Sequence, residues 1–255
     1  ILLISNYLKF IMKVIFLAAG AGSRLGKYTE KLPKALVKIH DSSLIELQIK
    51  LLKRQKDFEI SIIRGYKKEK FKLKNVEYID DDQYSEHDQL GSLICALNEI
   101  RNDVLILFAD ILFEENILQK IIDASGDISI ALDKNWAKRY DKQKNKQYPA
   151  LVEIKKEKIV YITEHYKNTN NETAEFLGIV KLSEKGSKIL VDTIQRKKNH
   201  IGKFHDSINF KSAKLTDILQ EIILAKQEIS PIFVNGKWIE VDTEDDLIIA
   251  KKMFR

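Results

Sequence analysis

Short apolar runs alternate with longer amphipathic stretches between residues 13 and 109. The apolar runs are rich in valine, isoleucine, leucine and phenylalanine, and they predict β-strands at residues 13–19, 58–66, 75–80 and 103–109. Between these runs, residues 44–55 and 91–100 carry apolar side chains at helical spacing. Strands that alternate with helices predict an α/β fold with a mostly parallel central sheet and helices on both faces.

The pattern changes after a helix expected at residues 114–124. Apolar runs then predict strands at residues 127–133, 150–156, 158–164 and 175–183, the last three antiparallel. We expect roughly residues 133–182 to form a small antiparallel insertion over the active-site edge of the sheet. The chain closes with helices expected at 183–197, 215–227 and 243–254 and strands at 229–235 and 237–241, with Thr216 as the N-cap of the middle helix.

The composition is that of a globular protein with a substantial core. Hydrophobic residues make up 44% of the 255 residues, and 43 Lys and Arg stand against 37 Asp and Glu, which gives a net charge of +6. This excess falls short of the dense basic surface of a nucleic-acid binder and favours a small anionic partner. The single cysteine, Cys95, excludes an internal disulfide and fits a cytoplasmic protein; we expect its thiol to be buried in an apolar helix.

The domain organisation is predicted to be simple. Residues 1–11 are apolar but too short to span a membrane, and we expect them to be a non-native or disordered leader, with an edge strand or an amphipathic tail as the alternative. Residues 12–255 contain no repeat and no low-complexity linker, so we expect a single domain. Nothing in the sequence indicates a membrane partner or an oligomeric state.

A loop rich in glycine and basic residues follows the first predicted strand, in the stretch LAAGAGSRLGKYTEKLPKAL from residue 17 to 36. Glycines let backbone N–H groups approach phosphate oxygens closely. Gly20, Gly22 and Gly26 do not have the spacing of a dinucleotide fingerprint. The stretch also lacks the Gly-Lys-Ser/Thr of an ATPase phosphate loop, because Tyr28 follows Gly26-Lys27.

The longer pattern Leu-Ala-Ala-Gly-x-Gly-Ser-Arg-Leu, followed after seven residues by Pro-Lys-x-Leu, resembles the signature of the nucleoside diphosphate sugar pyrophosphorylase superfamily of nucleotidyltransferases. The form Ser-Arg-Leu-Gly is more similar to its cytidylyltransferase branch. This resemblance implies a Rossmann-like fold in which the backbone of the loop contacts the nucleotide and Arg24 and Lys34 stabilise charge at phosphorus. The loop residues that it assigns to nucleotide binding are Leu17, Ala18, Ala19, Gly20, Ala21, Gly22 and Ser23.

Two aspartates are candidates for a Mg²⁺ site, which nucleotidyl transfer requires to offset phosphate charge. Asp110 follows the apolar strand VLILFA, and Asp242 follows the strand KWIEV near the end of the chain. The resemblance assigns both as metal ligands, although Asp242 can also serve as a helix cap. Glu240 is assigned to the acceptor side of the site, with a solvent-facing position on an edge strand as the alternative.

The stretch DDDQYSEHDQLGSLICAL is the candidate for base recognition. It resembles both the Gln-x-x-Gly-Ser/Thr of sugar nucleotidyltransferases and the Asn-x-x-Tyr, Asn-Asn-x-x-Ser-Leu of phosphocholine-type cytidylyltransferases, with aspartate at two asparagine positions. A carboxylate can accept a hydrogen bond from the exocyclic amine of cytosine, but ATP also carries an amine, and a glutamine amide can turn toward uracil. The nucleotide-binding residues expected here are Asp81, Tyr84, Asp88, Gln89, Gly91 and Ser92.

The polar stretch from Lys134 to Gln147 is expected to lie over the acceptor, and it resembles an Asp-x-x-Trp segment of phosphonate-pathway cytidylyltransferases. Its many lysines suit an acceptor with a phosphate and a further carboxylate better than a quaternary ammonium, although a solvated charge run is the simpler interpretation of residues 142–146. The residues assigned to the acceptor are Lys134, Trp136, Arg139, Glu175 and Glu240.

The sequence therefore predicts a Mg²⁺-dependent cytidylyltransferase whose partners are CTP and a small phosphorylated acceptor. By the resemblance the acceptor is phosphocholine, an aminoalkylphosphonate or a phosphoamino acid such as phosphoglutamine, and the product decorates a capsule or surface polysaccharide. Two alternatives remain: a sugar-1-phosphate nucleotidyltransferase that uses UTP or dTTP, and a nucleotide sensor that has lost catalysis.

Overall fold

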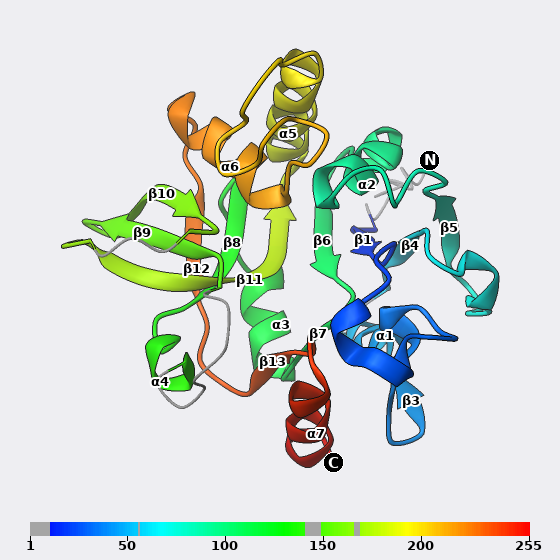
Figure 1. The fold of residues 1–255 in the computed structure, drawn as a ribbon. Helices are drawn as coiled ribbons and strands as arrows, with labels where there is room; N and C mark the ends of the chain where they lie inside the picture. Colours follow the sequence, from blue (N-terminus) through cyan, green and yellow to red (C-terminus); the bar gives the residue numbers. More distant parts are fainter. Residues whose placement is uncertain (1–10, 56, 141–148, 166–168) are drawn as a thin grey trace, which may run out of the picture.

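Among the residues that the structure describes, a nine-stranded mixed sheet forms the centre of the fold (Figure 1). The computed structural model describes residues 11–55, 57–140, 149–165 and 169–255. Seven strands follow the order β10-β9-β11-β6-β1-β4-β5, while β8 pairs with β11 and β12 with β8. The strands are β1 (Lys13–Leu17), β4 (Glu59–Arg64), β5 (Glu77–Asp80), β6 (Val104–Phe108), β8 (Ile128–Asp133), β9 (Leu151–Lys155), β10 (Lys158–Thr163), β11 (Glu172–Leu182) and β12 (Ser230–Phe233).

The first half of the sheet is the parallel unit that the sequence predicts. Strand β1 pairs in parallel with β4 and β6, and β4 pairs in parallel with β5. The helices α1 (Leu44–Gln55), α2 (Gln89–Cys95) and α3 (Glu115–Ile122) connect or follow these strands. All four strands of this unit point the same way, so their carboxyl ends and the loops that follow them lie at one edge of the sheet.

The second half of the sheet is built around β11, which pairs antiparallel with β6, β8 and β9. Strands β9 and β10 of the expected insertion thus belong to the same sheet as the parallel strands β1, β4, β5 and β6. The pairing of β11 with β8 shifts between Phe176 and Val180. Gly178 has a φ of 69° there, and a Cβ on it would lie 2.4 Å from the Phe108 ring, so the bend requires glycine.

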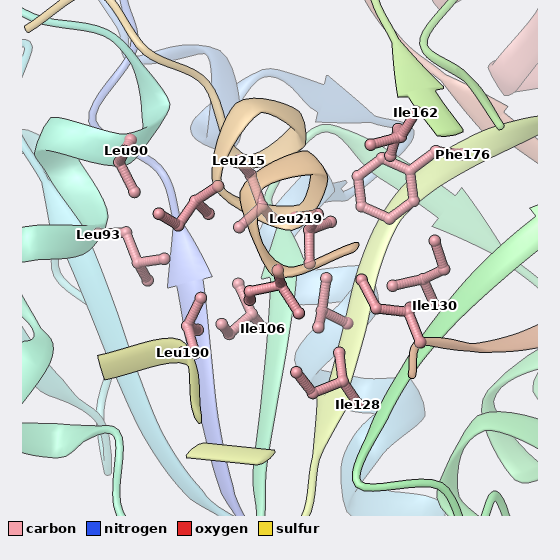
Figure 2. Packing of buried hydrophobic residues seen from close by; sticks show 14 of the residues in the cluster. Leu90, Leu93, Ile106, Ile128, Ile130, Ile162, Phe176, Leu190, Leu215 and Leu219 are labelled. Atoms are coloured by element: carbon pink, nitrogen blue, oxygen red, sulfur yellow. The ribbon is translucent and has the colours of Figure 1, made fainter. Parts of the chain in front are cut away.

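Helices cover both faces of the sheet. On one face, α2, α5 (Glu184–Lys197) and α6 (Leu215–Leu224) bury a cluster that Figure 2 shows from close by. Ile106 of β6 lies in this cluster among leucines of those helices, whereas its neighbours Leu105 and Leu107 point to the other face, against α1 and α3. The alternation along β6 therefore buries side chains on both faces of the sheet. Asp110 lies just beyond the carboxyl end of this strand, at the edge of the sheet between the two helical layers.

Several local predictions need correction. Lys214, not Thr216, is the N-cap of α6, and the helix ends at Leu224. The helix expected at residues 91–100 is α2 followed by a separate 3₁₀ turn at Leu97–Glu99. Cys95 is exposed rather than buried. Residues 1–10 and 141–148, on which the expected leader and part of the basic stretch fall, lie outside the described residues, and none of the described helices is long and apolar enough to cross a membrane.

Candidate active site

Backbone pairing brings Asp110 and Asp242 together from distant parts of the chain. Ala109 N donates to Leu17 O at 3.2 Å, which places Asp110 beside the start of the glycine-rich loop. The short strand β7 (Ile111–Phe113) directly follows Asp110 and pairs antiparallel with β13 (Trp238–Glu240). Val241 N then donates to Asp110 O at 2.9 Å, so Asp242 follows at the same edge of the sheet.

Two cations of the glycine-rich loop contact these aspartates. Lys34 Nζ donates to Asp110 Oδ2 at 2.6 Å and to Asp242 Oδ1 at 2.5 Å, while Arg24 Nη2 lies 3.0 Å from Asp242 Oδ1. Gly22 makes room for this arrangement: its φ is 67°, and a Cβ on it would lie 2.7 Å from Lys34 Cβ. Burial opposes the charge of Lys34, but the two aspartates outweigh it and raise the pKa of this lysine, which stays an ammonium at neutral pH.

The residues present fit a divalent cation. One carboxylate oxygen each from Asp110, Glu240 and Asp242 lie within 4.8 Å of one another. Burial, together with the negative charges of Asp242 and Asp110, raises the pKa of Glu240 to about 8. Asp110 Oδ1 is buried and accepts no hydrogen bond from the described residues. Three clustered carboxyl groups, with one buried Asp110 oxygen left without a hydrogen bond, are the kind of hard oxygen donors that Mg²⁺ prefers.

A cavity of about 310 Å³, which we term the loop cavity, extends from this acidic cluster along the glycine-rich loop. Within the part of the chain that the structure describes, the backbone N–H groups of Gly20, Ala21 and Gly22 donate to no acceptor. Such free N–H groups at the carboxyl edge of a parallel sheet suit an anion. The lining residues are Leu17, Ala19, Gly20, Gly22, Ser23, Arg24, Lys34, Tyr84, His87, Asp88, Gln89, Ser92, Phe108, Asp110 and Asp242.

A second cavity, of about 340 Å³, adjoins the first and is termed the α6 cavity, because the start of α6 forms part of its wall. It shares Arg24, Gln89, Phe108 and Asp242 with the loop cavity, so the acidic cluster lies at the junction of the two. Its remaining lining residues are Ile111, Pro149, Ala150, Glu164, Glu175, Phe176, Leu177, Gly178, Lys214, Thr216, Trp238, Glu240 and Thr243.

Comparison with known proteins identifies the family. The MobA-like NTP transferase domain matches residues 14–161, more than half of the chain, including the glycine-rich loop and Asp110. The chain belongs to this family. It is a nucleotidyltransferase, and the junction of the two cavities is its candidate active site.

The relatives of this nucleotidyltransferase include two named cytidylyltransferases. The CTP:phosphoglutamine cytidylyltransferase of Campylobacter jejuni is 27% identical over 252 residues, which cover 92% of this chain and 98% of that protein. The choline-phosphate cytidylyltransferase of Streptococcus pneumoniae is 39% identical over 107 residues, 40% of this chain and 47% of that protein. The solved CTP:phosphocholine cytidylyltransferase of S. pneumoniae covers 96% of this chain and is itself fully covered, with a TM-score of 0.76 at 22% identity, which shows the same fold.

The expected base-reading residues of the nucleotidyltransferase fall into two groups. Tyr84, Asp88, Gln89 and Ser92 line the loop cavity. Asp81, by contrast, is 1% exposed and accepts from Ser92 Oγ at 2.7 Å, with His87 Nε2 at 3.1 Å. Asp81 therefore holds lining residues in place from behind.

Two further expected nucleotide residues also lie behind the lining. A Cβ on Gly91 would lie 2.3 Å from the His87 ring, so this glycine makes room for His87. Ala18 N donates to Ile63 O at 3.0 Å, inside the sheet. Ala21 lies between the lining residues Gly20 and Gly22 but is not itself among the lining residues.

The expected acceptor residues are also divided. Glu175 and Glu240 line the α6 cavity, whereas Lys134 and Trp136 line neither cavity. Lys134 Nζ pairs with Glu172 at 2.8 Å, and Trp136 is 6% exposed and donates from Nε1 to Thr173 at 3.2 Å. Arg139 lies on the short helix α4 (Ala137–Tyr140), and its side chain is outside the described residues.

Several lining residues are not among the site residues that the sequence predicts. His87 and Phe108 line the loop cavity, and Glu164, Lys214 and Thr216 line the α6 cavity. His87 lies inside the base-reading stretch, and its position directly before Asp88 and Gln89 is a sequence feature that could have predicted it as a lining residue. Glu164, Lys214 and Thr216 gave no such signal, because a strand end and a helix start 50 residues apart meet only in the folded protein.

Proposed function

We propose that the chain is a Mg²⁺-dependent cytidylyltransferase that transfers CMP from CTP to a small phosphorylated acceptor and releases pyrophosphate. The observation that carries the proposal is the position of Asp110, Glu240 and Asp242 at the junction of two adjoining cavities. The loop cavity, with its free N–H groups, suits a nucleoside triphosphate. The α6 cavity then holds the acceptor on the other side of the acidic cluster.

The reaction forms one P–O bond and breaks another. An oxygen of the acceptor phosphate attacks the α-phosphorus of CTP, and the bond from this phosphorus to the bridging oxygen of the β-phosphate breaks. The attacking oxygen is already ionised near neutral pH, so no general base is needed. Lys34 and Arg24, which contact Asp242 at the junction, stabilise the negative charge that develops there. A bound Mg²⁺, held by Asp110, Glu240 and Asp242, would supply further neutralisation of the phosphate oxygens.

The geometry of Asp88 and Gln89 supports CTP as the nucleotide. Leu215 N donates to Gln89 Oε1 at 3.3 Å, so the Gln89 amide has its NH₂ left to donate to a base carbonyl. Asp88 Oδ1 accepts from Gln89 N at 2.7 Å, and its carboxylate, exposed at the loop cavity, can only accept. A carboxylate acceptor matches the exocyclic amine of cytosine and disfavours the O4 carbonyl of uracil. The similarity to the cytidylyltransferases of C. jejuni and S. pneumoniae supports the same choice.

A screen of CTP, UTP, dTTP and ATP against phosphorylated acceptors, with pyrophosphate release as the readout, tests the proposal. We expect release with CTP and a phosphoamino acid, aminoalkylphosphonate or phosphocholine acceptor. Release with UTP or dTTP and a hexose 1-phosphate, and none with CTP, would overturn it. That result would favour a sugar-1-phosphate nucleotidyltransferase instead.

A further inference from the structure

A charged pair occupies the part of the α6 cavity wall formed by β10 and α6. Glu164 lies just after β10, and Lys214 is the N-cap of α6. Lys214 Nζ donates to Glu164 Oε2 at 2.9 Å, and Thr216 Oγ1 donates to Glu164 Oε1 at 2.9 Å. The Glu164 and Lys214 side chains are 19% and 29% exposed, and both line the cavity. The pair is thus partly withdrawn from water but open to a ligand.

Hydrogen bonds to Asp206 and Asp217 fix the backbone of both residues of this pair. Asp206 Oδ2 accepts from Glu164 N at 2.7 Å, and Asp217 Oδ2 accepts from Lys214 N at 2.8 Å. Asp217 Oδ1 in turn accepts from Asp206 N at 2.9 Å and links the two segments. Burial opposes the charge of Lys214, but Glu164 outweighs it and raises the pKa of the lysine. A rigid charge of each sign is therefore presented to the cavity.

The pair discriminates between acceptors by the charges of their distal ends. A ligand that fills the cavity displaces water from both side chains. A quaternary ammonium matches Glu164 but brings a second cation to Lys214, and a lone carboxylate does the reverse. Each leaves one partly buried charge with a like charge beside it, which is costly in a low-dielectric site. A group that carries both an ammonium and a carboxylate gives each side chain an opposite charge.

We propose that Lys214 and Glu164 form a subsite for a zwitterion, so that the acceptor is a phosphorylated α-amino acid. Its carboxylate binds Lys214, its ammonium binds Glu164, and its phosphate reaches Arg24, which lines both cavities at their junction. This subsite rests on the proposed cytidylyl transfer and narrows its acceptor class.

Acceptors that differ in one charged group test the subsite. O-phospho-L-serine and phosphoglutamine carry the zwitterion, O-phosphoethanolamine lacks the carboxylate, and 3-phosphoglycerate has a hydroxyl in place of the ammonium. With CTP and Mg²⁺, we expect kcat/KM for the better zwitterion to exceed that of both single-charge acceptors at least about 10-fold, the factor that 1.4 kcal/mol of discrimination provides. Turnover of phosphoethanolamine, phosphocholine or 3-phosphoglycerate as efficient as that of both zwitterions would overturn the subsite and leave the cytidylyl transfer intact. No pyrophosphate with any acceptor would overturn the proposed function itself.

Two variants separate a binding role from a structural one. Lys214→Met should raise KM for the zwitterion about 10-fold or more and leave KM for phosphoethanolamine unchanged or lower, since the lysine repels that acceptor. Glu164→Gln keeps the bond to Thr216. It should raise KM for the zwitterion about 10-fold or more and leave KM for 3-phosphoglycerate unchanged or lower. KM for CTP should not change in either variant. A uniform rise in KM for every acceptor would show that the pair is only structural.

A matched control comes from the same segment of the chain. Lys211 pairs with Glu86 at 3.0 Å, its side chain is 61% exposed, and it lines neither cavity. Lys211→Met removes a lysine three residues from Lys214 and should leave KM for every acceptor at the wild-type value. If Lys211→Met raised the zwitterion KM as much as Lys214→Met, the effect would come from net charge and the subsite would be wrong.

Discussion

Replacing Lys34 by methionine removes one positive charge while keeping most of the volume of the side chain. Lys34 Nζ lies 2.6 Å from Asp110 and 2.5 Å from Asp242, and its side chain is 13% exposed. Removing one partner of a buried ion pair costs about 3–5 kcal/mol, because the remaining charge loses its counter-charge. Here the carboxylates of Asp110 and Asp242 would face each other beside Glu240, with the 61% exposed Arg24 still in contact with Asp242.

This cost converts into a large shift of the unfolding midpoint. For 255 residues, an unfolding entropy of about 2.1 cal/mol/K per residue gives a decrease of about 6–9 °C. The aspartates raise the pKa of Lys34 above its ordinary value of 10.5, so its stabilising charge is fully present at neutral pH and is lost only as the pH rises through that raised value. The full decrease is therefore expected at pH 7.

Thermal unfolding of the Lys34→Met variant, followed by circular dichroism with EDTA and with saturating MgCl₂, measures this shift. Because the variant has lost its internal cation, Mg²⁺ should raise its midpoint more than that of the wild type. The control is Lys185→Met: Lys185 lies 2.6 Å from Asp127 but is 72% exposed, so its loss should change stability by less than about 1 kcal/mol. A Lys34→Met midpoint equal to the wild type in EDTA would refute the electrostatic reasoning.

Three further predictions follow from single contacts. Gly22→Ala places a Cβ 2.7 Å from Lys34 Cβ at a φ of 67°, so it should lower kcat and cost about 1–2 kcal/mol, as measured by steady-state kinetics and urea unfolding. Asp88→Asn keeps an N-cap for α2 but adds a donor, so the ratio of kcat/KM for CTP to that for UTP should fall; an unchanged ratio would exclude Asp88 from base selection. Ser43→Ala removes a 2.7 Å bond to Glu46 and should cost about 1 kcal/mol at pH 7. Hydrogen bonds from the Ser43 backbone and hydroxyl lower the pKa of Glu46 below its ordinary value of 4.5. The cost of Ser43→Ala should therefore shrink as the pH falls below 4.5, and urea unfolding at pH 7 and below pH 4.5 measures the difference.

The nucleotide side of the site was the most predictable from sequence, because local rules place its residues. The glycine-rich loop and Asp110 each directly follow an apolar run that became a parallel strand, and parallel strands end at one edge of a sheet. Asp242 also directly follows an apolar run, and the resemblance assigned it to the metal site. The antiparallel pairing of β13 with β7, which brings Asp242 beside Asp110, has no signal in the sequence.

The acceptor side was less predictable, because tertiary contacts decide it. Trp136 follows a strand as the aspartates do, yet its indole turns inward to Thr173 and is buried. The Glu164 and Lys214 pair depends on β10 meeting the start of α6 across 50 residues of sequence. Charge composition favoured the lysines after Lys134, of which those in residues 141–148 lie outside the described part of the chain; among the described residues, the α6 cavity wall contains Glu164, Glu175, Glu240 and Lys214.

The fate of each phosphate of CTP is the most direct test of the central claim, that this site directs attack at the α-phosphorus. The enzyme is incubated with Mg²⁺, a phosphorylated acceptor and CTP radiolabelled at either the α- or the γ-phosphate, beside an Asp110→Asn control. We predict that the α-label appears in a CMP-linked acceptor and the γ-label in pyrophosphate, and that Asp110→Asn abolishes both. Transfer of the γ-label to the acceptor, or release of the α-label as free CMP with the acceptor unchanged, would contradict the account.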